Sequence, residues 1–241
     1  MIKFTYLDLI DSTISFQPIM ANNWFHHQGK PYSLFSLDET KPFAIPGYKG
    51  KRCIIEIEMA KVLSRIQKQI YGDGLSLKVY DAYRPQRAVD FFTTWTEFPD
   101  TPIAKSLHYP RVNKKEFHDL SYLSRTSSHT LGTAVDVTII HRTSTYREKE
   151  HDFLGLWDPE SLDMGVGYLC FDERSSFAFD VTEFQRSNRL LLHNIMIDHQ
   201  FEPLETEFWH YYLNRYQNRE VFYDFEIRDD YQVNEDLTLC L

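Results

Sequence analysis

The sequence predicts an α+β fold with a mostly antiparallel sheet and flanking helices. Apolar residues recur every three or four positions in residues 56–70 and 183–200, which is the period of a helix. They alternate at period two in residues 75–83 and 133–140, which is the period of a strand. Helices and strands mixed in this order along the chain are typical of an α+β domain.

In order along the chain, the first clear element is a helix over residues 56–70. Its apolar positions are Met59, Val62, Leu63, Ile66 and Ile70. Two glycines follow it, and residues 75–83 then predict a half-buried strand with its apolar side chains on one face. The dipeptide Arg84-Pro85 opens a second helix, which continues through Trp95.

Residues 99–128 contain proline, serine and histidine without clean periodicity, so we expect a long loop that frames a site. Residues 133–140 predict a strand with Val135 and Val137 on one face and Asp136 on the other. The charged residues 141–152 predict an exposed insertion. Residues 205–213 predict a further strand.

The helix predicted over residues 183–200 is expected to bury one apolar stripe. We assign to that stripe Leu190, Leu191, Ile195 and Ile197. After it, the tail from about residue 219 to 241 is acidic and aromatic, and its pattern predicts no element.

Length and composition predict a single domain over residues 1–241, because there is no internal repeat and no low-complexity linker. The hydrophobic fraction of 42% is that of a folded protein. A net charge of −9 would repel a phosphate backbone, so we expect no nucleic-acid partner. No stretch approaches the roughly 18 consecutive apolar residues of a membrane-spanning helix, so we expect no membrane partner either.

Three cysteines, Cys53, Cys170 and Cys240, lie far apart and form no CxxC pair. We interpret them as small buried thiols. The odd count favours a reducing compartment, and the N-terminal residues differ from a signal peptide because Asp8 and Asp11 interrupt the apolar positions. A cytoplasmic location is therefore expected.

Two short segments carry side chains suited to one metal site. In SSHTLGTAVD, His129 lies seven positions before Asp136, and in ETEFWH, Glu207 lies three positions before His210. Hydrolytic zinc usually takes three protein ligands from histidine and carboxylate side chains and leaves a fourth position for water. The set of His129, Asp136 and His210 satisfies that number.

The spacing within each pair sets a geometric condition. On an uninterrupted strand His129 and Asp136 would face opposite ways, so a turn at Gly132 must bring His129 round. Glu207 and His210 also have opposite strand parity, and their convergence requires a bulge, a bend or a strand end.

Each signal also has an ordinary structural interpretation. Either pair taken alone is a common accident of polar loops, and Arg84 equally fits a helix-start cation paired with Asp81. Aromatic side chains next to His210 fit strand packing, namely Phe208, Trp209, Tyr211 and Tyr212. We assign no metal to the other histidines and interpret them as surface or core-edge residues: His26, His27, His108, His118, His141, His151, His193 and His199.

Six blocks, in the same order, resemble the D-alanyl-D-alanine dipeptidases, the group that includes the vancomycin-resistance dipeptidase. The blocks are YDAYRPQRA (residues 80–88), SSHTLGTAVD (127–136), LDMG (162–165), DERS (172–175), NRLLL (188–192) and EFWH (207–210). The likeness spans about residues 80–210 and is weaker in the helix before it. The first fifty residues and the acidic tail are expected to diverge.

The resemblance implies one zinc ion per chain and hydrolysis of a small peptide, D-Ala-D-Ala. It also implies the α+β fold that this group shares with zinc D-Ala-D-Ala carboxypeptidases and the Hedgehog signalling domain. The roles it carries over are metal binding by His129, Asp136 and His210, general acid/base catalysis by Glu207, stabilisation of the carbonyl oxygen or its oxyanion by Arg84, and substrate contact by Ser127.

The chain also departs from the family pattern. Leu169 stands where the family usually has an acidic residue that meets the substrate's ammonium group, a contact worth about 1.5–3 kcal/mol. Leu131 replaces a usual arginine, and the insertion after Ile140 is long. Three nearby acids are candidates to replace the missing one: Asp163, Asp172 and Glu173.

These departures leave two alternatives to a D-Ala-D-Ala dipeptidase. The first is a related zinc carboxypeptidase or other peptidase that acts on a longer or differently charged peptide, because of Leu169. The second is a zinc-binding module without turnover, since one fold serves many functions. The carboxylate of Glu207 argues against the second alternative, because a non-catalytic site has little need of it.

Overall fold

The computed structural model describes residues 2–143, 153–213 and 221–241. Its central sheet has five strands in the order β2-β6-β7-β9-β8. These strands span Ser15–Phe16 (β2), Leu75–Asp81 (β6), Ala134–His141 (β7), Phe201–Leu204 (β8) and Glu207–Leu213 (β9). Strand β2 pairs parallel with β6, and the other three pairings are antiparallel. The prediction of a mixed α+β fold is confirmed.

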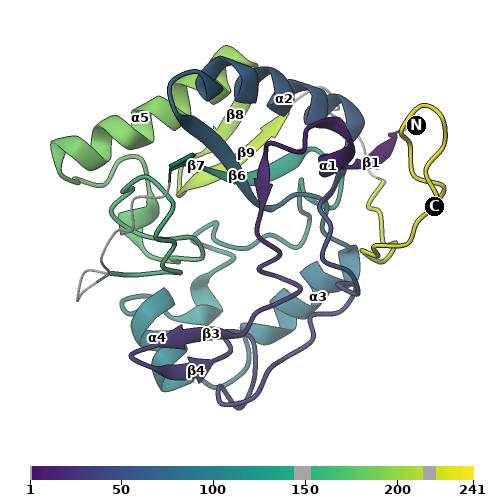
Figure 1. Ribbon diagram of the computed structural model, residues 1–241. Coiled ribbons are helices and arrows are strands. Elements are labelled where there is room, and N and C mark those ends of the chain that lie inside the picture. Colours follow the sequence, from purple (N-terminus) through teal and green to yellow (C-terminus); the bar gives the residue numbers. More distant parts are fainter. Residues whose placement is uncertain (1, 144–152, 214–220) are drawn as a thin grey trace.

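The remaining elements surround this sheet. Two short two-stranded sheets pair β1 (Phe4–Tyr6) with β5 (Ile54–Glu56) and β3 (Phe25–His27) with β4 (Lys30–Tyr32). The helices are α1 (Leu7–Ile10), α2 (Ile57–Tyr71), α3 (Gln86–Trp95), α4 (Pro102–His108) and α5 (Glu183–Asp198). Helices α2 and α5 lie along one side of the sheet, whereas α3, α4 and the β3–β4 hairpin form the other half of the molecule (Figure 1).

Helix α2 forms where the apolar period predicts it, and its five predicted core residues are buried. The Glu56 side chain caps its first turn by accepting a hydrogen bond from the backbone N–H of Met59 at 2.7 Å. The next strand, β6, is buried on both faces, since Ser76, Lys78 and Tyr80 are covered as well as Leu77. The expectation of a half-buried strand was wrong because residues 158–168 cover its second face, where Asp158 pairs with Lys78 and Tyr168 stacks on Tyr80.

The segment from 99 to 128 is not the featureless loop that its sequence predicts. It contains α4 and a short 3₁₀ helix, Lys114–Glu116. Helix α4 has proline in its first turn and buries only Ala104, Leu107 and His108. A seven-residue helix with so few buried positions is too short to produce a recognisable apolar period.

Helix α5 has the predicted location but buries a different stripe. Ile195 is buried as predicted, whereas Leu190, Leu191 and Ile197 are 46%, 39% and 44% exposed. The buried side of the helix carries Asn188, Arg189, Leu192, Ile195 and Met196. The buried side was misassigned from the sequence because two of its residues, Asn188 and Arg189, are polar.

Both chain termini pack into one small hydrophobic cluster beside the main core. The cluster contains Ile2, Phe4, Tyr6, Ile54, Tyr83, Ile227 and Leu239. In Figure 1 the C-terminal segment lies next to β1 and the N-terminus. The tail also reaches the centre of the molecule, because the N–H of Tyr223 donates to the carbonyl of Thr130 and its carbonyl accepts from the N–H of Gln86.

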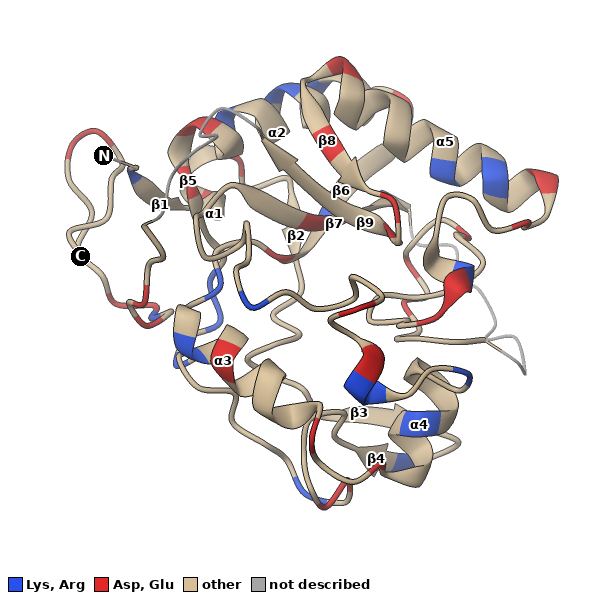
Figure 2. Cartoon of the chain, turned by 180° about the vertical axis from the view of Figure 1, so that it is seen from behind, with Lys and Arg blue, Asp and Glu red and all other residues tan. Residues whose placement is uncertain are grey.

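The predicted exposed insertion falls largely outside the described residues, which omit 144–152. No helix in the described ranges combines the length and apolarity needed to cross a membrane. Cys53 and Cys170 are buried thiols as predicted, but Cys240 is exposed, and all three are free. Basic residues are distributed over α2, α3, α4 and α5 rather than gathered on one helix (Figure 2).

Candidate active site

Three neighbouring strands align the polar residues at the centre of the site. Strand pairing places Asp81 of β6 opposite Asp136 of β7, and Asp136 opposite His210 of β9. Residues directly opposite each other on adjacent strands project from the same face of the sheet. Ordinary antiparallel pairing therefore brings together three distant segments of the chain.

His129 reaches this row from a turn rather than from β7. Residues 128–132 form the turn, and Gly132 adopts a φ of +72° there. A side chain at position 132 would place its Cβ 2.5 Å from the ring of Phe4, so only glycine fits. The N–H of Gly132 donates to the carbonyl of His129, and the N–H of Thr133 donates to the carbonyl of Ser128. This turn accounts for the odd spacing between His129 and Asp136.

Three candidate ligand atoms converge at the spacing that a tetrahedral zinc site needs. His129 Nε2 lies 3.2 Å from His210 Nδ1 and 3.3 Å from Asp136 Oδ1, and His210 Nδ1 lies 3.0 Å from that oxygen. Zinc bonds of about 2.0–2.1 Å at tetrahedral angles separate neighbouring ligand atoms by about 3.3 Å. Within the described ranges, this is the one group of three or more such side chains close enough to hold a metal ion.

Hydrogen bonds fix which atoms of the two imidazoles are free for a ligand role. His129 Nδ1 lies 2.6 Å from the carbonyl of Ala82, which can only accept, so this nitrogen carries the proton and Nε2 is left as the lone-pair donor. On His210, Nε2 lies 3.4 Å from Ser128 Oγ, and Nδ1 faces the cluster. Such outer hydrogen bonds are typical of histidines that ligate metals.

The two oxygens of Asp136 have different partners. Oδ1 faces the two imidazoles, whereas Oδ2 accepts a hydrogen bond from the Tyr168 hydroxyl at 2.7 Å and lies 3.5 Å from Arg84 Nη2. Burial would raise the pKa of Asp136, but electrostatic interactions and hydrogen bonds with the His129 and His210 imidazoles outweigh it and hold the pKa well below its usual range. Asp136 is therefore a carboxylate, as a metal ligand must be.

Glu207 and His210 share the site because the β8–β9 pairing is irregular. Pro203 lies opposite Tyr211, but the next residue, Leu204, lies opposite Glu207. This shift supplies the bulge that their opposite parity requires, and both residues line one cavity.

The environment of Glu207 suits a group that exchanges protons. Only 7% of Glu207 is exposed. Burial, followed by the nearby charge of Asp136, raises the pKa of Glu207 well above its ordinary value, although Arg84 and a hydrogen bond with Trp209 act in the opposite direction. A carboxyl group with a raised pKa is a better proton carrier near neutral pH than an ordinary one.

Arg84 pairs with Asp81, as the ordinary interpretation predicts, and it also lines the cavity; its role toward a substrate stays a prediction. Its Nε donates to Asp81 Oδ2 at 2.9 Å, and the Tyr48 hydroxyl donates to the same carboxylate at 3.0 Å. Burial lowers the pKa of Arg84, but the charge of Asp81 more than compensates and raises it above its usual value. The guanidinium is thus a fixed positive charge beside the cluster.

The cavity has a volume of about 440 Å³ and collects the six predicted site residues. They are Arg84, Ser127, His129, Asp136, Glu207 and His210. Ser127 Oγ also accepts a hydrogen bond from the N–H of His129 at 3.2 Å, so it lies next to the proposed ligand.

The three acids proposed to replace the missing family carboxylate do not line the cavity. Asp163 accepts hydrogen bonds from the N–H of Gly165 and the side chain of Gln185. Asp172 and Glu173 both pair with Arg111. These partners hold the acids elsewhere, so the expectation that one of them substitutes for an acid at position 169 was wrong.

The sequence interpretation missed several residues that support the site. Tyr168 contacts Asp136, Ser128 contacts His210, and Tyr48 bonds to Asp81, the partner of Arg84. Nothing in the spacing of these three residues indicates it. His108 was expected at the surface or core edge but is fully buried. His151 lies outside the described residues.

Comparison with known proteins finds similarity to D-Ala-D-Ala dipeptidases. A family described as "D-ala-D-ala dipeptidase" matches residues 40–228. The D-alanyl-D-alanine dipeptidase of Streptomyces coelicolor is 30% identical over 225 residues, which cover 93% of this chain and 98% of that enzyme. The enzyme of the same name from Enterococcus faecium is 28% identical over 228 residues, covering 94% and 99%. The Escherichia coli enzyme is 29% identical over 167 residues, covering 69% of each chain.

The site and these relatives define a metallopeptidase. Because the family match covers most of the chain, the chain belongs to the D-Ala-D-Ala dipeptidase family. The likeness reaches far beyond residues 80–210, so the expected divergence of both terminal segments was overstated.

Proposed function

We propose that this protein hydrolyses the dipeptide D-Ala-D-Ala with one zinc ion held by His129, Asp136 and His210. The spacing of 3.0–3.3 Å between the three ligand atoms is the observation that carries the proposal. Zinc at a site with an open position lowers the pKa of a bound water to about 7. The names of the relatives support D-Ala-D-Ala as the substrate.

Glu207 is the proton-handling group in this proposal. Its carboxylate takes a proton from the attacking water and passes it to the nitrogen of the leaving amino acid. The raised pKa favours the protonated form that the second transfer needs.

Arg84 and Ser127 act on the substrate. The Arg84 guanidinium donates hydrogen bonds to the carbonyl oxygen of the scissile bond as negative charge develops on it, and Asp81 holds the guanidinium in place. The Ser127 hydroxyl lies beside His129 on the cavity wall, where it contacts the bound peptide.

The fold and location are part of the same proposal. We propose one domain over residues 1–241, supported by a main core whose members run from Leu7 to Leu213. We further propose the Hedgehog/D-Ala-D-Ala zinc peptidase type of α+β fold. Three free cysteines support a cytoplasmic location.

Glu207→Gln tests the role of the carboxylate. The purified wild-type enzyme with zinc is expected to release alanine from D-Ala-D-Ala, and the variant should lose at least about 100-fold in kcat while keeping one zinc per chain. His210→Ala is the matched control, because it should lose both activity and zinc. Full activity in Glu207→Gln would remove Glu207 from the mechanism, and absence of alanine release from the zinc-loaded wild type would reject the substrate.

One alternative retains support from a specific observation. Asp136 and Glu207 are the two carboxylates on the cavity wall among the described residues, and both already have roles in the proposed chemistry. A related peptidase acting on a peptide without a free ammonium group remains the second candidate. Membership of a peptidase family argues against a zinc module without turnover.

A further inference from the structure

The cavity lining includes six apolar side chains that the proposed chemistry does not use, called here the apolar wall. They are Met20, Phe35, Val89, Phe92, Leu169 and Phe171. The wall begins directly beside the proposed reaction centre. The Arg84 guanidinium lies 5.5 Å from the centre of the Phe92 ring, and Leu169 follows Tyr168, whose hydroxyl is bonded to Asp136.

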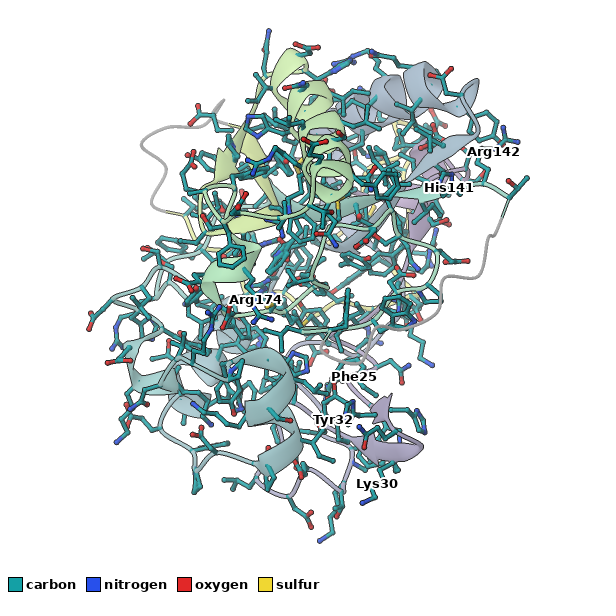
Figure 3. All side chains as sticks on the ribbon, turned by 90° about the vertical axis from the view of Figure 1, so that its left-hand side faces the viewer. Phe25, Lys30, Tyr32, His141, Arg142 and Arg174 are labelled. Atoms are coloured by element: carbon teal, nitrogen blue, oxygen red, sulfur yellow. The ribbon has the colours of Figure 1, made fainter. Side chains whose placement is uncertain are left out.

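Leu169 enters this wall from a strained backbone. Its φ is +59°, a left-handed conformation that branched or bulky residues rarely adopt. A buried relay maintains it, because His108 Nδ1 lies 2.8 Å from the carbonyl of Leu169 while His108 Nε2 lies 2.8 Å from the Tyr32 hydroxyl. Tyr32 belongs to the β3–β4 hairpin, in the opposite half of the molecule from His141 and Arg142 at the end of β7 (Figure 3).

Strain of this kind persists only when surrounding contacts enforce it, and it concentrates at functional sites. Glycine or asparagine would relieve it, yet the chain keeps an apolar side chain at this point of the cavity. Leu169 and its neighbours offer no charge, so a charged substrate group placed against them would lose its hydration without gaining an ion pair. An apolar group placed there would gain about 25 cal/mol for each Å² removed from water.

We propose that this wall is a specificity subsite for a bulky apolar side chain of the substrate. The inference rests on the proposed function and extends its substrate class from D-Ala-D-Ala to D-dipeptides in which a larger apolar residue replaces one alanine. The cavity volume of about 440 Å³ is that of a site for ligands larger than a dipeptide with two methyl side chains.

A substrate panel on the zinc-loaded wild-type enzyme tests the subsite. The panel compares D-Ala-D-Ala with the same dipeptide carrying D-Leu or D-Phe at the first or the second position. We expect kcat/KM for the best apolar member to exceed that for D-Ala-D-Ala by at least about 10-fold, the usual effect of filling an apolar pocket. Highest activity on D-Ala-D-Ala overturns the subsite but leaves the proposed function standing, whereas cleavage of no member overturns both.

Leu169→Asn then tests the wall directly. Asparagine tolerates a positive φ, so the backbone is retained while the apolar surface is lost. The preference for the apolar peptide should fall about 10-fold, measured as the ratio of the two kcat/KM values. The control is Leu191→Asn, the same substitution at a position on α5 that is 39% exposed, and it should leave the ratio unchanged. An unchanged ratio in Leu169→Asn would show that the wall does not select the substrate.

Discussion

The two carboxylate oxygens of Asp136 have different neighbours in the candidate site. One oxygen faces both imidazoles, and the other is held by a phenol and approached by a guanidinium. A carboxylate with one oxygen restrained in this way presents the other in a single orientation. The geometry of the candidate metal site therefore depends on Tyr168, which is not itself a ligand candidate.

Tyr168→Phe is expected to weaken zinc binding by about 10- to 100-fold, because it removes the hydrogen bond that orients Asp136. Competition with a chromophoric chelator measures the affinity. Tyr80→Phe is the matched control, since the Tyr80 ring stacks on Tyr168 at 4.8 Å but its hydroxyl bonds to Asp158. Equal zinc affinity in Tyr168→Phe and wild type would contradict the positioning role.

Glu207 should make the metal-free protein less stable as pH rises. Its pKa is raised in the folded state, so the unfolded state releases the proton first and stability falls as pH rises above the ordinary pKa of glutamic acid. Metal-free Glu207→Gln should therefore melt several degrees higher than metal-free wild type at pH 7 and equally at pH 4. Thermal unfolding at both pH values measures this, and equal melting at pH 7 would show that the carboxyl costs no stability.

At the scale of single residues, the sequence predicts which side chains form the candidate site but not which neighbours hold them in place. Parity predicts the turn at Gly132 and an irregularity between Glu207 and His210, because side chains alternate strictly along a strand. That this irregularity is a bulge is seen only in the structure. The contact between Tyr168 and Asp136 joins segments without any shared period, and it arises only when the chain is packed.

Among the elements, α5 shows how a helix can be predicted correctly and oriented incorrectly. Arg189 is buried because its guanidinium donates to the carbonyls of Met164, Ser176 and Arg174. In the sequence such an arginine reads as a surface residue. The buried side of the helix therefore cannot be recognised from its apolar positions alone. Three consecutive leucines then leave the choice of face open to the packing of neighbours.

Truncation of two adjacent leucines on α5 should destabilise the fold to different degrees. Leu192→Ala should destabilise the fold by about 2–5 kcal/mol, because Leu192 is fully buried and its loss leaves a cavity. Leu191→Ala should cost less than about 1 kcal/mol, because 39% of Leu191 is exposed. Urea unfolding of both variants measures the difference. A larger loss in Leu191→Ala than in Leu192→Ala would place the helix in the rotation that the sequence predicts.

For the molecule as a whole, the α+β class was predictable because each long element has a clear period. The short helix α4 was not, because its three buried residues produce no apolar period. The strained Leu169 was not, because its contact with His108 joins positions 61 residues apart in the chain. The candidate ligands were predictable from chemistry, since few residue types bind zinc.

Removal of zinc should lower the melting temperature of the entire domain. At a free zinc concentration about 1,000 times the Kd, zinc binding adds about 4 kcal/mol to the free energy of unfolding. For a chain of this size that raises the melting temperature by on the order of 10 °C. Thermal unfolding with and without a chelator measures the shift. His210→Ala should show no chelator-dependent shift, and a shift of similar size in that variant would place the ion elsewhere.

The docking of Tyr223 between Thr130 and Gln86 ties the end of the chain to the turn that carries His129 and to the helix that follows Arg84. Docking of the C-terminal segment and metal binding are two linked equilibria, and linkage is reciprocal. Detachment of the segment must therefore lower the metal affinity by the same factor by which bound metal favours its docking. The rate at which a protease clips the C-terminal segment would then serve as a readout of metal occupancy.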